Sequence, residues 1–282
     1  MLTFPASYIK SSGEGGGGGG GGDPFPASVA VNVDLDATMA ASFDDGVDDQ
    51  KWFNMIASPS DGAAQSDYDF YLGADGNSST DDPTFTGTVG DAAAYLAMDG
   101  GDFLKLAKAS NPATFNDMHK TTGGPDFWLA LVFRFISTGV GQFPFGTLGL
   151  VINDPHIRMQ IAATDKVRLT QRGSANAVSI ETSALSDATD YVVIISHKHS
   201  TNITKIWVNS STPAVDAAHT FSITTINAAT VASIGARSNN SNAVGNGTRI
   251  YAFSSGDEFL DNTKVGAILD LYEARHGRDY TP

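Results

Sequence analysis

The chain has 282 residues, of which 41% are hydrophobic, and this is enough for one large β-domain or two small ones. A formal net charge of −14 argues against direct nucleic-acid binding, because no basic stripe is present to displace counterions from phosphates. The absence of cysteine excludes disulfides and thiolate metal sites, and no run of about 20 apolar residues is present to insert into a membrane.

The N-terminal segment joins a short apolar head to eight consecutive glycines, Gly15 to Gly22. Glycine has no side chain to bury and a large backbone entropy to lose, so this tract cannot form a packed core. We predict an N-terminal anchor and poly-glycine arm over residues 1–22, used as a linker or as an extended element packed between several chains. The candidate anchoring and oligomerisation residues are Phe4, Tyr8, Ile9, Gly15, Gly18 and Gly22.

After this arm, residues 23–50 are rich in aspartate and show little periodicity, which predicts a polar connector. The remaining residues, 51–282, form the predicted body. Its first clear motif has Tyr95 and Leu96 before a turn at residues 99–101, with Leu104 and Leu106 after it. The Asp-Gly-Gly turn favours a tight strand reversal and predicts a hairpin.

Residues 126–137 are almost all apolar, which predicts a central strand covered on both faces. Short β-like segments follow at regular spacing up to residue 255, so a sandwich or barrel is predicted. One helix is predicted over 262–277, with Asn262 or Thr263 as its cap and Gly277 as its stop. Three tryptophans, Trp52, Trp128 and Trp207, fall inside apolar strand patterns, which favours core packing over stacking on sugars.

Three parts of the body, in this order, resemble concanavalin A-like, laminin-G-type jelly rolls, and bacteriophage virion proteins in particular. They are the turn over 98–103, the strand that carries Phe127, Trp128 and Phe133, and the ending with Leu271, Tyr272, Arg275 and Gly277. The resemblance implies an all-β, antiparallel jelly-roll sandwich, with the glycine-rich arm outside it and one short C-terminal helix. It also implies a virion setting.

Glycoside hydrolases on the same fold need two neighbouring carboxylates. The comparable patch here is Asp257 and Glu258 with Asp261, and it lies at the entry to the predicted helix. Glu181 stands alone. We therefore expect a chain that is not an enzyme.

Calcium is the one cofactor that the sequence suggests. Asp75, Asn77, Ser79 and Asp81 alternate in a loop and offer oxygen ligands, although the rest of an EF-hand loop is missing. Asp75, Asn77 and Asp81 are the candidate metal ligands. His197 and His199 alternate on one strand and can share a metal, but without a third ligand nearby we expect exposed histidines.

The sequence thus predicts a non-enzymatic phage virion protein, displayed on the surface of the head or tail through its N-terminal arm. A fibre, a tail tip and a capsid decoration all fit. Its expected partners are other virion proteins and copies of itself, most simply in a trimer. The alternative is a carbohydrate-binding or receptor-binding module that recognises host surface glycans.

Overall fold

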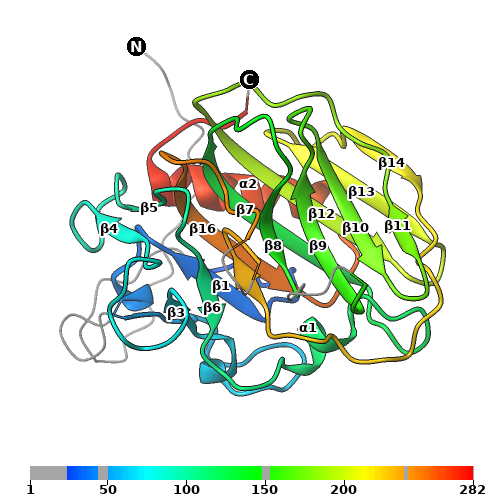
Figure 1. Ribbon diagram of the computed structural model, residues 1–282. Coiled ribbons are helices and arrows are strands. Elements are labelled where there is room, and N and C mark those ends of the chain that lie inside the picture. Colours follow the sequence, from blue (N-terminus) through cyan, green and yellow to red (C-terminus); the bar gives the residue numbers. More distant parts are fainter. Residues whose placement is uncertain (1–23, 44–49, 148–152, 238–240, 282) are drawn as a thin grey trace, which may run out of the picture.

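The computed structural model describes residues 24–43, 50–147, 153–237 and 241–281. These residues fold into two antiparallel β-sheets packed face to face, with one long helix near the C-terminus, so the predicted all-β sandwich is confirmed (Figure 1). In the described part of the chain, no helix has the length and apolar character needed to cross a bilayer. Outside it lie the candidate anchoring residues of the arm: Phe4, Tyr8, Ile9, Gly15, Gly18 and Gly22.

Sheet A is built around the long apolar strand. In spatial order it contains β14 (Val215–Ala218), β13 (Ile203–Val208), β12 (Thr189–Lys198), β7 (Phe127–Phe135), β16 (Arg249–Gly256), β5 (Tyr95–Ala97) and β4 (Thr84–Thr86), and β1 (Val33–Asp36) also pairs with β16. The central position of β7 is the one predicted for residues 126–137.

Sheet B forms the second layer. In spatial order it contains β11 (Asn176–Val178), β10 (Val167–Arg172), β9 (His156–Ile161), β8 (Gln142–Gly146), β15 (Ser233–Ile234), β6 (Leu104–Leu106), β3 (Phe70–Leu72) and β2 (Lys51–Trp52). Short helical elements lie in the connections: η1 (Ala40–Ser42), η2 (Gln65–Tyr68) and α1 (Ala113–Asp117).

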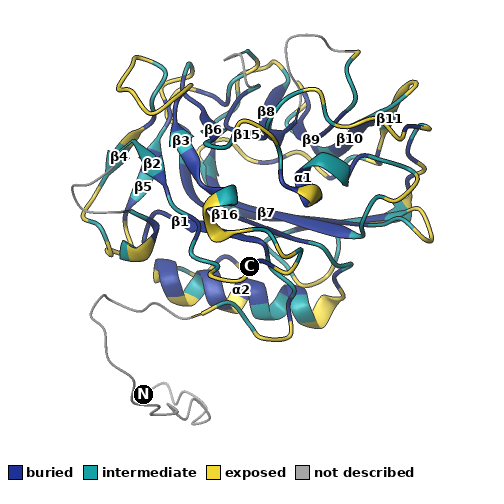
Figure 2. Ribbon diagram, turned by 90° about the horizontal axis from the view of Figure 1, so that it is seen from below, coloured by how far each residue is buried: buried dark blue, intermediate teal, exposed yellow. Residues whose placement is uncertain are grey.

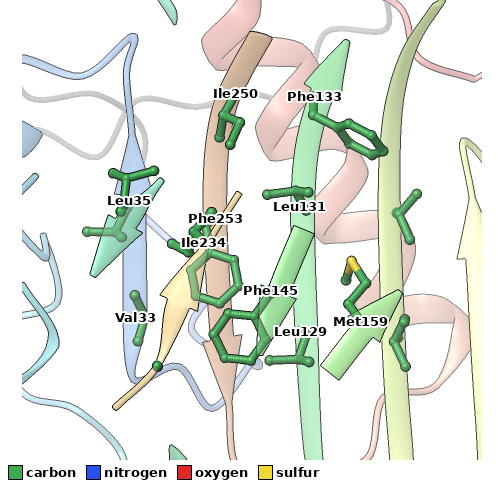
Figure 3. Close-up of a cluster of buried hydrophobic side chains, with 14 of the residues drawn as sticks. Val33, Leu35, Leu129, Leu131, Phe133, Phe145, Met159, Ile234, Ile250 and Phe253 are labelled. Carbon is green, nitrogen blue, oxygen red and sulfur yellow. The ribbon is translucent and has the colours of Figure 1, made fainter. Parts of the chain in front are cut away.

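The core between the sheets takes alternate residues from each strand. Leu129, Leu131 and Phe133 of β7 face it, and Phe145 of sheet B stacks on Phe253 of sheet A with ring centroids 4.8 Å apart (Figure 3). The three tryptophans are fully buried, as predicted.

Helix α2 (Asn262–His276) covers the outer face of sheet A, as Figure 2 shows. Val265, Ile268 and Tyr272 pack on Trp128 and Trp207, so the central strand is covered on both faces as predicted. The cap lies one residue before the predicted candidates: the Asp261 side chain accepts a hydrogen bond from Lys264 N at 2.9 Å. Gly277 ends the helix at a φ of +58°, a conformation that glycine adopts easily.

The prediction of a hairpin over residues 95–106 is wrong. The chain does reverse after Asp99, but β5 joins sheet A and β6 joins sheet B. Leu96 and Leu104 therefore meet across the core as members of opposite sheets. Turn chemistry sets the local reversal, and it does not decide whether the two flanking strands pair with each other or with more distant strands.

The predicted polar connector over residues 23–50 is wrong for residues 33–36, which form β1. Val33 and Leu35 enter the core, while Asp34 and Asp36 point to the other face, toward α2. Arg275 Nη2 donates to Asp34 Oδ2 at 2.9 Å, and His276 Nε2 lies 3.2 Å from Asp36 Oδ2. The aspartates make the sequence of this segment polar. They can nevertheless be buried because side chains of α2 pair with them.

Candidate ligand-binding face

The two outer faces of the sandwich differ in what covers them. Helix α2 lies against sheet A, whereas no helix of the described residues covers the outer face of sheet B, which faces the viewer in Figure 1. This face carries polar side chains from several strands, and its central residues are buried: Ser233 is 1%, Arg158 6% and Thr170 0% exposed. The outer face of sheet B is the candidate functional site.

One row of outward side chains crosses every strand of sheet B. In spatial order the strand register gives Lys51, Tyr71, Lys105, Ser233, Gly146, Arg158, Thr170 and Val178. Residues directly opposite each other in antiparallel strands share a face, and Ile157 and Met159 on either side of Arg158 face the core. The row contains three cations and no carboxylate, in a chain with 31 acidic and 17 basic residues.

A β-bulge in β8 adds an aromatic ring to this face. The register of β8 against β9 shifts between Gln142 and Phe145. Phe145 enters the core, and the irregularity lets Phe143 lie on the outer side, where its ring contacts Arg158. Bulges commonly redirect a side chain in this way.

Two guanidinium groups lie over the Phe143 ring. The central guanidinium carbon of Arg158 is 4.6 Å from the ring centroid, and that of Arg237 is 4.9 Å away. Arg158 is only 6% exposed. No atom within the described residues accepts a hydrogen bond from Arg158 Nε, Arg158 Nη1 or Arg237 Nε.

Burial and the neighbouring charge of Arg237 lower the pKa of Arg158 to about 10. Burial also lowers the pKa of Arg237. A pKa of about 10 leaves Arg158 protonated at neutral pH. The face therefore holds two positive charges that the described part of the chain does not neutralise.

A satisfied hydrogen-bond network lies beside these arginines. Arg168 Nη1 donates to Glu181 at 2.6 Å, and Arg168 Nε donates to Gln160 Oε1 at 3.2 Å. Thr170 Oγ1 donates to the same Gln160 oxygen at 3.2 Å. Val178, at the edge of the sheet, is 46% exposed. The network fixes the side chains around Arg158. It also pairs the Glu181 carboxylate with Arg168 and not with Arg158.

The candidate calcium residues lie in a loop beside this row, where Gly76 lies against the ring of Tyr71 and the charge of Lys105 acts on Asp75. Asp75 Oδ1 accepts hydrogen bonds from the backbone and side-chain nitrogens of Asn77, and these bonds lower the pKa of Asp75. The neighbouring Asp82 accepts from Ser79 N. Among the residues with a described position, no three histidine or acidic side chains are grouped to hold a metal ion. The calcium site stays a prediction.

The prediction of exposed strand histidines is wrong for His197. Its ring is fully buried and stacks on Phe221 with centroids 4.0 Å apart. Thr204 Oγ1 bridges it to His219, at 2.8 Å from His197 Nδ1 and 3.0 Å from His219 Nδ1. Burial lowers the pKa of His197 to about 2, which makes it a neutral core residue.

The acidic patch considered for hydrolysis, Asp257, Glu258 and Asp261, forms hydrogen bonds that include residues near the start of the described chain. Glu258 Oε1 accepts from Ala30 N at 2.6 Å, and Glu258 Oε2 pairs with Lys264. Asp257 accepts a hydrogen bond from Ser60, and Asp261 caps α2. These carboxylates thus have structural partners near the entry to α2.

A hollow of about 720 Å³ lies near η1 and η2, lined in part by Phe43, Phe53, Asn54 and Gln65. Its polar groups are used within the chain: Asn54 Oδ1 accepts from Asp34 N, and Gln65 Nε2 donates to Asn54 O. This hollow offers fewer free binding groups than the outer face of sheet B.

Sequence reasoning did not identify the arginine site. The alternation in residues 156–161 does show Arg158 and Gln160 on the face opposite Met159. Phe143 and Arg237 come from other strands and loops, so no signal in the sequence places them beside Arg158.

No family model matches the sequence, and no curated protein matches it. Among solved structures, the chain is similar to the Trypanosoma rangeli sialidase in complex with sialic acid, at 10% identity and a TM-score of 0.56, covering 89% of this chain and 34% of that chain. The covalent intermediate of the same sialidase with 2,3-difluorosialic acid matches at 11% identity and a TM-score of 0.54, covering 88% and 33%. The CBM40 domain of the Ruminococcus gnavus IT-sialidase bound to alpha2,3 sialyllactose matches at 15% identity and a TM-score of 0.42, covering 54% and 90%.

The two matches to the Trypanosoma rangeli sialidase show the β-sandwich fold. The chain spans about a third of the length of the Trypanosoma rangeli sialidase chains that it matches. None of the three structures is a virion protein, so the particle setting expected from the sequence gains no support from them.

Proposed function

We propose that this chain is a non-enzymatic, carbohydrate-binding β-sandwich that holds a glycan against the outer face of sheet B. The observation that carries the proposal is the row of outward side chains that crosses all eight strands on a face without a covering helix. Lysine and arginine donors suit sugar hydroxyl and acid oxygens, and Tyr71 adds a hydroxyl and a ring.

The absence of catalysis in this proposal rests on the carboxylates. Hydrolysis of a glycoside needs an acid and a nucleophile or base that face each other across the bond. On the outer face of sheet B, Glu181 is bound to Arg168. Glu258 lies elsewhere, near the entry to α2, where it is bound to Ala30 and Lys264. The geometry of sheet B supports the glycan proposal, since the similarity to sialidases extends to the fold alone.

Display on a particle through residues 1–22 stays a separate prediction. Those residues lie outside the described part of the chain, so the structure bears only on the sandwich. A displayed sandwich that binds glycans is compatible with the proposed function.

The test is a glycan array with the full chain, followed by calorimetric titration of the glycans that bind. The variants are Lys105→Ala, in the middle of the row, and Lys198→Ala, a matched control in sheet A at the end of β12. We expect Lys105→Ala to weaken binding at least threefold and Lys198→Ala to leave it within twofold. No binding to any glycan, or equal losses in both variants, would contradict the proposal.

A further inference from the structure

We propose that Arg158 and Arg237, together with Phe143, form an anion site on the outer face of sheet B that takes the carboxylate of an acidic sugar. This inference rests on the proposed function and names the class of glycan. It follows from the charge, the packing and the free hydrogen-bond donors of these three residues.

The first step is the charge balance of the buried arginines. Arg134 and Arg278 pair with Asp190, Arg168 with Glu181, and Arg275 with Asp34. Four arginines of the described ranges have no acid partner, and of these Arg158 is buried, whereas Arg172, Arg237 and Arg249 are partly exposed. A buried, unpaired cation destabilises a fold, so its presence needs a compensating group.

The second step is that the packing builds the site. The bulge in β8 brings Phe143 beneath the guanidinium groups, and cation–π contact stabilises them. Gly146, opposite Arg158 on β8, leaves room for the arginine, because a Cβ at this position would lie 2.8 Å from the Cβ of Arg158. The Gln160 and Thr170 pair fixes the next positions along the face.

The third step is the chemistry of the ligand. Arg158 Nε and Nη1 each lack an acceptor within the described residues, and charged donors of this kind form strong hydrogen bonds to the oxygens of a carboxylate. Arg237 Nε provides a further donor. Two cations repel metal ions and basic ligands, and a net charge of −14 disfavours long polyanions. A single acidic group on an otherwise neutral sugar satisfies both limits.

The experiment titrates the full chain with matched pairs of sugars at low and high salt. The acidic probes are glucuronic acid, galacturonic acid and sialyllactose, and the neutral probes are glucose, galactose and lactose. Acetate and sulfate test for a site that takes any anion. We expect each acidic sugar that binds to bind at least tenfold more tightly than its neutral partner, and added salt to reduce this preference.

The variants are Arg158→Gln and Arg237→Gln, with Arg172→Gln as the control, because Arg172 lies on the same face and donates to the carbonyl of Asn153. We expect either site variant to lose the preference for acidic sugars and to keep its binding to neutral glycans, while the control keeps both. Circular dichroism establishes that each variant is folded. In the unmodified chain, the NMR signals of the arginine Nε–H groups report contact with the sugar directly.

The outcomes separate the two proposals. Binding of glycans without any preference for acids overturns the anion site and leaves the glycan function. Equal binding of acetate or sulfate and of the acidic sugars means an adventitious ion only, and this also overturns it. Failure of every sugar to bind overturns the proposed function itself.

Discussion

At the scale of single residues, two buried arginines have opposite surroundings. Arg275 lies between Asp34 and Asp36, with Nη1 and Nη2 donating to Asp34 at 3.0 and 2.9 Å. Arg158 lies over an aromatic ring, and the described residues offer it no acid. The first arginine neutralises charges inside the fold, whereas the second leaves charge for a ligand.

The buried histidines give the stability a pH dependence at this same scale. Burial, and then the charges of Arg158 and its neighbours, lower the pKa of His156 to about 4, and burial lowers that of His219 to about 4. In the unfolded chain a histidine titrates near 6.5. Below pH 6.5 the unfolded state binds more protons than the folded state, so stability falls as the pH falls from about 6.5 toward 4.

We expect His156→Asn to reduce this acid sensitivity. A shift from 6.5 to about 4 is equivalent to about 3 kcal/mol of unfolding free energy between pH 7 and pH 4 for one buried histidine. Urea unfolding at pH 7.5, 5.5 and 4.5 measures this slope for the variant and the unmodified chain. The variant can be less stable at pH 7.5, but its slope must be smaller. Equal slopes would show that His156 is not the titrating group.

At the scale of elements, α2 and β1 stabilise each other across sheet A. β1 pairs with β16, and its two outward aspartates reach Arg275 and His276 in the last turn of α2. Tyr272 adds a hydrogen bond to Ser254 at 2.8 Å. The segment before the predicted body and the helix at its end thus form one buried polar layer.

We expect Arg275→Met to lower the unfolding free energy by about 3–5 kcal/mol, because it leaves two buried carboxylates without their guanidinium. The matched control is Arg158→Met, which removes a buried cation that lacks an acid partner among the described residues. This control should change stability by no more than about 1 kcal/mol, or increase it. Chemical denaturation of both variants at pH 7.5 decides the matter, and similar losses would refute the distinction between the two arginines.

At the scale of the whole molecule, the chain has three layers: α2, sheet A and sheet B (Figure 2). The helix gives sheet A two apolar faces, and sheet B has one apolar and one polar face. The polar face of sheet B is opposite the side where Phe25 packs, with its ring 5.7 Å from Trp128. Attachment through the N-terminus would therefore leave the candidate site facing away from the attachment point.

We expect deletion of residues 1–22 to leave the thermal unfolding midpoint of the dilute protein unchanged, because the described contacts of the N-terminal side begin at Phe25. The same deletion should abolish self-assembly if the arm joins several copies, and light scattering measures the mass of both proteins. A variant with serine in place of Gly15 to Gly22 keeps the length and adds side chains. Loss of assembly in this variant indicates close packing of glycine strands, whereas retained assembly indicates a linker.

By itself, the sequence determined the elements whose signals are local. Alternation along residues 156–161 and 167–172 gave strands with one apolar face, and the unbroken apolar run over 127–135 gave a strand covered on both sides. The end of the last helix at Gly277 followed from its need for a positive φ. These properties depend on neighbours within a few residues.

Only the tertiary structure decided which strands pair and which side chains meet. β5 and β6 look like a hairpin, yet they pair with β16 and β3, and the aspartates of β1 are buried only because Arg275 lies more than 200 residues away in the sequence. The arginine site depends in the same way on a bulge in β8 and on Arg237, which follows β15 in the sequence. Periodicity reports whether a residue is buried, but the identity of its partner is set by contacts between distant segments, which no local pattern records.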